Sequence, residues 1–244
     1  MTENGFEAIP GTGNVLFLCD HAANALPPGH GTLGLKPDLF QTHIAWDIGA
    51  AAVTRALASV YGAPAVLGCW SRLLIDLNRG ADDPTIVMKL SDGSIIPGNR
   101  DAGPDEVARR IAAYHAPYHA AITRALDAMG PDAVVVSMHS FTPSWKGVPR
   151  PWEYGVLYDR DIRMAAPLMR RLAQAGYSVG DNEPYHGALD GDTLNVHGTR
   201  RGLPHVLIEM RQDLIATDAA AQDFAARLKP ILDMALSDMK STSE

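Results

Sequence analysis

Residues 133 to 140 read Ala-Val-Val-Val-Ser-Met-His-Ser, and the fold class follows from this segment. A short, nearly continuous apolar run predicts a strand that is buried on both faces of a parallel sheet. The run ends in a polar pair, His139 and Ser140. Parallel α/β sheets bind their ligands at the carboxyl ends of the strands, so this pair is a candidate for a functional site.

Similar apolar runs recur along the chain, with helical segments between them. Strands are predicted at residues 14–19, 64–69, 73–77, 154–158 and 205–210. Helices are predicted at residues 48–61 after an Asp47 cap, at 105–129 with an interruption at Pro117, at 161–175 and at 217–239. This alternation predicts a single α/β domain over residues 1–244, in three layers: a mostly parallel or mixed central sheet with helices on both faces.

Composition excludes several classes of protein. The chain has 21 Lys and Arg against 28 Asp and Glu, a net charge of −7, which disfavours nucleic acid and anionic membranes as partners. No segment has the pattern of a membrane span or a signal peptide, so we expect a cytoplasmic protein. The two cysteines, Cys19 and Cys69, are too far apart for a Cys-rich zinc module. The oligomeric state does not follow from the sequence.

Polar residues stand at the end of four of the apolar runs. They are Asp20 and His21, Asn78 and Arg79, His139 and Ser140, and Glu209 with Arg211. Because the carboxyl ends of parallel strands meet at one edge of a sheet, we expect these residues to converge on one crevice. The long segments 80–103 and 141–153 are expected to wall that crevice.

Two imidazoles at strand ends are what a Zn²⁺ ion requires, provided that an oxygen donor completes the set. The candidates are His21 and His139. Three oxygen donors are possible. Asn24 follows His21 by three residues, Asp20 immediately precedes His21, and Asp47 stands at a predicted helix start. A catalytic zinc also needs one open position for water.

Glu209 interrupts a run that would otherwise be pure core. A buried carboxylate is costly unless it is paired or moves protons, so Glu209 is a candidate general base and acid. The alternative is a structural ion pair with Arg211 or Arg72. A second group suits a substrate carboxylate, because Arg72, Asn78 and Arg79 flank one predicted strand that also holds Asp76.

Other motifs are weaker or missing. His115 and His119 have the i, i+4 spacing of a metal pair, but Pro117 lies between them and no glutamate accompanies them. The chain has neither a Gly-x-Ser-x-Gly elbow nor a phosphate-binding Gly-Lys-Ser/Thr loop. A serine hydrolase and a nucleotide-dependent phosphotransferase are therefore disfavoured.

Eight ordered motifs between about residues 14 and 215 resemble the N-formylglutamate amidohydrolase family. They are Cys19 to Asn24, His43 to Gly49, Ser71 to Arg79, Ser91 to Gly93, Ile96 to Asn99, Met138 to Pro143, Gly180 to Tyr185 and Ile208 to Leu214. The resemblance implies a zinc-exopeptidase-like fold and hydrolysis of an N-acyl amino acid, with N-formyl-L-glutamate, a product of bacterial histidine breakdown, as the expected substrate.

The chain is more distantly similar to the zinc aspartoacylases and succinylglutamate desuccinylases. This similarity implies a Zn²⁺ or other divalent ion on His21 and His139, with Asn24 where those enzymes carry Glu. It implies Glu209 as general base. In the mechanism that we expect, the metal and Arg72 stabilise the oxyanion. The substrate-binding residues would be Asp76, Asn78 and Arg79, with His197 as a further contact.

Two alternatives stay open. The chain could hydrolyse another N-acyl amino acid or a small carboxylated amide, because pocket loops set the acyl group and the fold does not. It could also be a catalytically silent protein that binds a small molecule or a partner and has lost the metal at Asn24.

Overall fold

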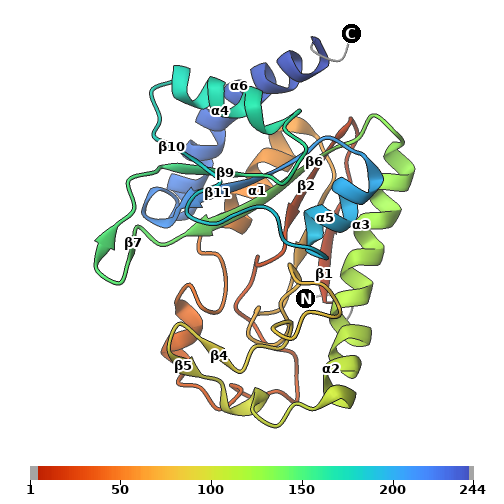
Figure 1. Ribbon diagram of the computed structural model, residues 1–244, viewed down its shortest axis with the longest axis vertical. Helices are drawn as coiled ribbons and strands as arrows, with labels where there is room; N and C mark the ends of the chain where they lie inside the picture. Colours follow the sequence, from red (N-terminus) through yellow and green to blue (C-terminus); the bar gives the residue numbers. More distant parts are fainter. Residues whose placement is uncertain (1–4, 242–244) are drawn as a thin grey trace.

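The structure, a computed structural model, describes residues 5–241 and is built on a seven-stranded mixed sheet (Figure 1). In spatial order the strands are β1 (Phe6–Ile9), β3 (Ala65–Gly68), β2 (Val15–Cys19), β6 (Val134–Phe141), β11 (His205–Arg211), β9 (Tyr154–Leu157) and β10 (Val179–Asp181). The central run from β3 to β11 is parallel, whereas β1 pairs with β3, and β9 with β11, in antiparallel fashion. The predicted mixed sheet is confirmed.

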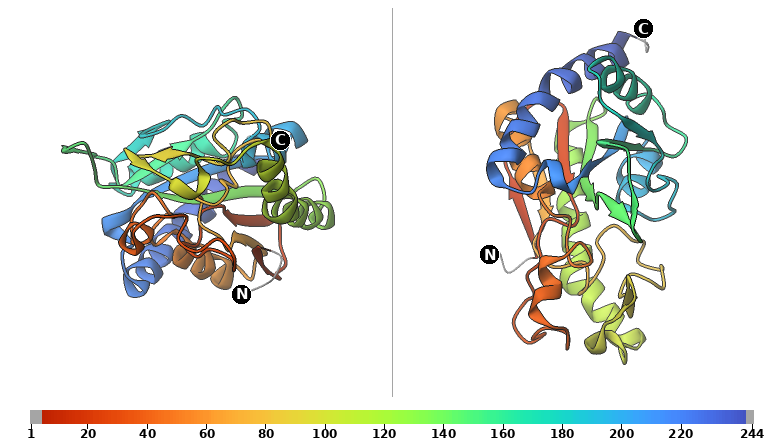
Figure 2. Two further views of the ribbon diagram at one scale, coloured as in Figure 1. Left: turned by 90° about the horizontal axis from the view of Figure 1, so that it is seen from below. Right: turned by 90° about the vertical axis from the view of Figure 1, so that its left-hand side faces the viewer.

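Helices cover both faces of this sheet (Figures 1 and 2). On one face lie α1 (Ala50–Tyr61), α4 (Ala165–Gln174) and α6 (Asp218–Ser241). On the other lie α3 (Ala116–Met129) and the short α5 (Thr193–His197). Phe17 of β2 packs into the first core and Leu16 and Leu18 into the second, so the strand is apolar throughout.

The interruption predicted at Pro117 is a π-turn that ends two residues before it, and the helix continues through Pro117 itself. Helix α2 (Pro104–Arg110) leads into a π-helical turn at Ile111–His115, and α3 follows directly. Proline has no backbone N–H and cannot complete the regular hydrogen-bond ladder, which explains the position of the turn. The predicted Asp47 cap of α1 is wrong, because Gly49, with φ of 81°, occupies the cap position. The Asp47 side chain instead bonds to His139.

The predicted strand at residues 73–77 is also wrong, because this buried segment forms turns. Side chains replace the sheet partners of its backbone. Asn99 Nδ2 donates to the Leu73 carbonyl oxygen at 2.7 Å, and Arg110 donates to the Leu74 carbonyl oxygen at 2.8 Å. Buried backbone groups need a partner, and these pairings allow an apolar run to be buried without a strand.

The two long segments expected to wall the site contain small hairpins. Strands β4 (Leu90–Ser91) and β5 (Ser94–Ile95) form one, and β7 (Ser144–Trp145) and β8 (Val148–Pro149) form the other, which projects from the body in both figures. Short 3-10 turns lie at Pro37–Gln41, Pro97–Asn99, Thr199–Arg201 and Gln212–Leu214. Within residues 5–241, no helix has the length and apolarity needed to cross a bilayer.

Candidate functional site

A cavity of about 390 Å³ opens at the carboxyl ends of β2, β6 and β11. Six side chains singled out from the sequence line it together: His21, Arg72, Asn78, Arg79, His139 and Glu209. These residues come from four separate regions of the chain. His21, His139 and Glu209 meet because parallel strands bring their carboxyl ends to one edge, whereas Arg72, Asn78 and Arg79 come from a buried segment outside the sheet. The structure therefore gathers most of the predicted polar residues at one crevice, but Asp20 lies behind His139, and Arg211 pairs with Asp213 outside the cavity.

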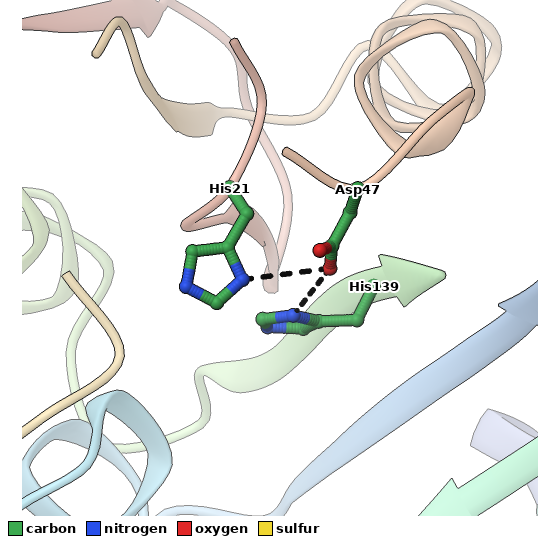
Figure 3. A group of neighbouring side chains, drawn as sticks. All are labelled: His21, Asp47 and His139. Atoms are coloured by element: carbon green, nitrogen blue, oxygen red, sulfur yellow. Dashed lines mark hydrogen bonds and ion pairs between the residues drawn. The ribbon is translucent and has the colours of Figure 1, made fainter. Parts of the chain in front are cut away.

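Two imidazoles and one carboxylate form the centre of this cavity (Figure 3). Asp47 Oδ2 lies 2.9 Å from His139 Nδ1 and 3.5 Å from His21 Nδ1. The two rings stand nearly perpendicular, with their centroids 5.1 Å apart. All three residues are buried, and one ligand atom from each lies within 4.8 Å of the others.

A second carboxylate lies behind each imidazole. His21 Nε2 is 2.7 Å from Asp76 Oδ1, and His139 Nε2 is 2.9 Å from Asp20 Oδ2. A carboxylate only accepts hydrogen bonds, so each ring donates from Nε2 and turns its Nδ1 toward Asp47. Outer carboxylates of this kind commonly fix the tautomer of metal-binding histidines.

The arrangement fits a divalent cation. Among residues 5–241, His21 Nδ1 has no well-formed hydrogen bond although it is buried and faces Asp47. His139 Nδ1 lies at hydrogen-bond distance from the Asp47 carboxylate and carries a proton here; burial opposes this charge, but the hydrogen bonds to Asp20 and Asp47 raise the pKa of His139 well above its usual value. A divalent cation that replaces this proton would receive one lone pair each from His21 Nδ1, His139 Nδ1 and Asp47 Oδ2. Nitrogen and carboxylate donors in this number are the usual ligands of Zn²⁺ in catalytic sites.

Charge within the cluster controls its titration. Burial alone would raise the pKa of the Asp20 carboxyl, but the hydrogen bond and charge of His139 outweigh it and lower that pKa well below its usual value. Burial likewise opposes ionisation of Asp76, and Arg72 and His21 lower its pKa well below the usual range. Both outer carboxylates are therefore ionised at neutral pH.

Glu209 faces the same cavity from β11. Its Oε2 is buried and has no hydrogen-bond partner among the described residues. Burial raises the pKa of Glu209 to about 7. On the neighbouring strand β9, Gly155 lies opposite Glu209. A Cβ atom at Gly155 would lie 3.1 Å from the Glu209 Cβ, so the glycine leaves room for the Glu209 side chain. A carboxyl poised near neutral pH can both accept and release a proton.

Arg72 contacts both Asp47, which lies between the two imidazoles, and Asp76, which lies behind His21. One guanidinium nitrogen lies 2.8 Å from Asp76 Oδ2, and another lies 3.5 Å from Asp47 Oδ1. The Arg72 side chain is 23% exposed and lines the cavity, so the same cation can also meet a ligand.

Asn78 and Arg79 also present donors to the cavity. Asn78 Oδ1 accepts a hydrogen bond from the backbone N–H of Thr193 at 3.1 Å, which leaves its NH₂ group for a ligand. One guanidinium nitrogen of Arg79 donates to the Asn78 carbonyl oxygen at 3.0 Å. Both side chains are thus anchored while they line the cavity.

Three other residues singled out from the sequence do not line the cavity. Asn24 Nδ2 donates to the Phe40 carbonyl oxygen at 2.8 Å. Asp76 is fully buried behind His21. The ring of His197 lies against His119, with 2.9 Å between His197 Nε2 and His119 Nδ1.

The sequence analysis did not single out two residues that shape the site. Asp192 lines the cavity and caps α5 by accepting from the Asn195 N–H at 2.7 Å. Burial raises the pKa of Asp192 to about 6. Thr193 donates from Oγ1 to Asp20 Oδ1 at 2.7 Å. The Asp-Thr-Leu-Asn sequence at 192–195 is the available signal, because Asp is a preferred helix cap.

Comparison with known proteins identifies the family. The model of the N-formylglutamate amidohydrolase family matches residues 13–216. This chain belongs to that family. By family it is a hydrolase that acts on amide bonds, which confirms the resemblance inferred from the motifs.

Two solved structures are similar over nearly the whole chain. The gene product Atu2144 of Agrobacterium tumefaciens is 36% identical, with a TM-score of 0.92, over 97% of this chain and 96% of that one. The N-formylglutamate amidohydrolase of Ralstonia eutropha JMP134 is 21% identical, with a TM-score of 0.67, over 98% of each chain. The second similarity shows a shared fold. Among curated proteins, none matches the chain significantly.

Proposed function

We propose that this amidohydrolase cleaves an N-acyl amino acid, and that N-formyl-L-glutamate is its substrate, giving formate and L-glutamate. The observation that carries the proposal is the His21, Asp47 and His139 group beside Glu209, in a cavity that also holds two guanidinium groups. Hydrolysis requires an activated water and a proton carrier, whereas an anionic substrate requires fixed cations.

We infer that His21, His139 and Asp47 hold a divalent metal ion, with Zn²⁺ the best match to this donor set. Of the three oxygen donors considered from the sequence, Asp47 is favoured because it faces both Nδ1 atoms. Asp20 bonds to the outer nitrogen of His139, and Asn24 bonds to Phe40. When bound, such an ion lowers the pKa of water and polarises a carbonyl group.

Glu209 is proposed to move the proton. Its Oε2 is buried, has no hydrogen-bond partner among residues 5–241 and carries a pKa of about 7, so it can take a proton from water at neutral pH. The same carboxyl can then deliver that proton to the amide nitrogen, which must be protonated before it leaves as an amine. No second acid is needed for the cycle.

The cationic side chains are proposed to position the substrate. Arg72 lines the cavity beside Asp47, where it would stabilise the negative charge that develops on the carbonyl oxygen. Asn78 and Arg79 would bind the amino-acid carboxylate through N–H groups. Asp76 then acts through Arg72 and His21, to which it is bonded, and not by touching the substrate. A contact of His197 with substrate stays a prediction.

A hydrolysis panel tests the proposal. Purified protein would be offered N-formyl, N-acetyl and N-succinyl glutamate and N-formyl derivatives of other amino acids, with metal analysis before and after chelation. We expect preference for N-formyl-L-glutamate, about one metal ion per chain and loss of activity with chelator. Equal rates on all acyl groups would refute the proposed substrate. Hydrolysis without metal would refute the proposed cofactor.

The same panel separates the two alternatives. A preference for another acyl group supports a related amidohydrolase. Binding of amino acids without turnover or metal supports a silent binding protein. We further propose a cytoplasmic enzyme of histidine breakdown, with a small-molecule substrate and no nucleic-acid partner, consistent with its net charge of −7.

A further inference from the structure

The segment Leu77–Arg79 carries the proposed carboxylate-binding side chains, yet it lies outside the sheet. Its backbone is held by two histidines of one helix. His119 Nε2 lies 3.0 Å from the Leu77 carbonyl oxygen, and His115 Nε2 lies 2.9 Å from the Arg79 carbonyl oxygen. The carbonyl oxygen between them, that of Asn78, accepts from the Arg79 guanidinium.

These contacts determine where the protons lie. A carbonyl oxygen only accepts, so His115 and His119 each carry a proton on Nε2. His119 Nδ1 then accepts from His197 Nε2–H at 2.9 Å. Burial lowers the pKa of His119 to about 3 and that of His197 to about 4. Burial also lowers the pKa of His115, so the three rings are neutral and keep fixed donor directions at physiological pH.

The π-turn in the helix aligns these donors. It inserts one residue between Arg110 and the histidines, and Arg110 donates to the Leu74 carbonyl oxygen of the same irregular segment. The His115 and His119 rings lie against each other, with centroids 4.1 Å apart. One face of the interrupted helix thus supplies hydrogen bonds along residues 74–79, which have no strand partner.

We propose that His115 and His119 are positioning residues for substrate binding: they hold Leu77–Arg79 in the conformation that presents Asn78 and Arg79 to the substrate carboxylate. The inference rests on the proposed function of those two side chains. Neither histidine ring lines the cavity, so both act through the segment that they hold. Their loss should weaken binding and leave the proton transfer at Glu209 intact.

Paired substitutions test this role. His115→Leu and His119→Leu remove the Nε2–H donor, whereas His115→Gln and His119→Gln retain an N–H donor on a side chain of similar reach. His205→Leu is the matched control, because His205 is buried, lies 2.8 Å from a carbonyl oxygen of Leu203 and sits at the opposite end of β11. It should lower stability without altering substrate binding.

We expect each Leu variant to raise the KM for N-formyl-L-glutamate about tenfold with kcat within about twofold of wild type. The Gln variants should recover most of that loss, and His205→Leu should keep the wild-type KM. N-formyl-γ-aminobutyrate lacks the α-carboxylate, so its KM should be the same in wild type and Leu variants. Wild-type KM in folded Leu variants, or a loss confined to kcat, would overturn the inference.

A measurement without substrate separates this inference from the proposed function. Hydrogen exchange of the backbone amides at residues 76–83 should accelerate in both Leu variants and stay at the wild-type rate in His205→Leu. Unchanged exchange there overturns the positioning role even if the enzyme is active. Inactivity of the wild type on every N-acyl amino acid, with accelerated exchange in the variants, would instead refute the proposed function and with it the carboxylate role of the segment.

Discussion

Glu209 lies directly opposite His139 in the register of the parallel strands β11 and β6. The pairing extends from His205 opposite Val135 to Arg211 opposite Phe141, so the backbone hydrogen bonds of two central strands fix the position of both side chains. A site built on strands holds its geometry more tightly than one built on loops. The proposed proton carrier and metal ligand therefore keep their separation without help from the substrate.

Replacing the proposed proton carrier should abolish turnover and spare binding. Glu209→Gln keeps the size of the side chain but cannot accept a proton, so we expect kcat to fall by about 10²–10⁴ with little change in KM. Steady-state kinetics and metal analysis check this. Asp213→Asn, which removes an exposed carboxyl paired with Arg211, is the control. A Gln variant with near wild-type kcat would assign the proton transfer to another group.

Activity should depend on the ionisation of Glu209. Burial raises its pKa to about 7, and only the carboxylate accepts a proton, so the active form is lost as the pH falls below that value. We expect kcat/KM to increase about tenfold per pH unit below about pH 7 and to level off above it. A rate profile over the neutral range measures this. Activity that stays constant down to about pH 5 would contradict a base with a raised pKa.

The oxygen ligand of the proposed metal can be decided by two substitutions. Asp47 faces both imidazoles, whereas Asn24 bonds to a backbone carbonyl, so Asp47→Ala should release the metal and Asn24→Ala should retain about one ion per chain. Elemental analysis of the purified variants gives the answer. Loss of metal from Asn24→Ala alone would reverse the assignment.

The outer carboxylates should tune metal affinity. Asp20→Asn and Asp76→Asn replace an ionised acceptor of a histidine Nε2–H with a neutral amide. We expect metal affinity to fall about 10- to 100-fold in each. Competition with a chelator measures the change. Asp190→Asn, in which a surface ion pair with Arg200 is removed, should bind metal as the wild type does.

Stability should depend on the side chains that replace sheet partners. Asn99 is fully buried, donates to the Leu73 and Met88 carbonyl oxygens and accepts from Arg110. Asn99→Leu leaves these groups without partners, so we expect the free energy of unfolding to fall by about 3 kcal/mol. Urea denaturation measures it. A loss below about 0.5 kcal/mol, the size typical of surface changes, would mean that water or other groups replace Asn99.

The central strands could be predicted because their run of apolar residues reflects the burial of both faces of the sheet. Residues 15–19 are apolar on both faces and residues 134–138 nearly so, since a helical layer covers each face of the sheet. The edge strands β1 and β10 and the five-residue α5 were not anticipated. They are short and partly exposed, so their composition differs little from that of loops.

The incorrectly predicted strand shows what hydrophobicity cannot distinguish. Residues 73–77 are as deeply buried as a central strand, but several of their carbonyl oxygens accept from side chains distant in sequence, including Asn99 and Arg110. Burial alone does not indicate which groups satisfy the backbone. The oxygen ligand of the proposed metal could not be chosen among Asn24, Asp20 and Asp47 for a similar reason. The choice depends on how the segment between β2 and α1 directs the Asp47 side chain, which hydrophobicity does not indicate.

The π-turn at Ile111–His115 makes the number of residues in this helix a structural requirement. Each residue of a regular helix turns the following side chains by about 100° about the axis. The π-turn absorbs one additional residue, so a deletion within it would give a regular helix with both sets of donors on the same face. A residue inserted between Arg110 and His115 without a further turn of this kind would rotate the two sets of donors apart, and no exchange of side-chain type would restore their common direction.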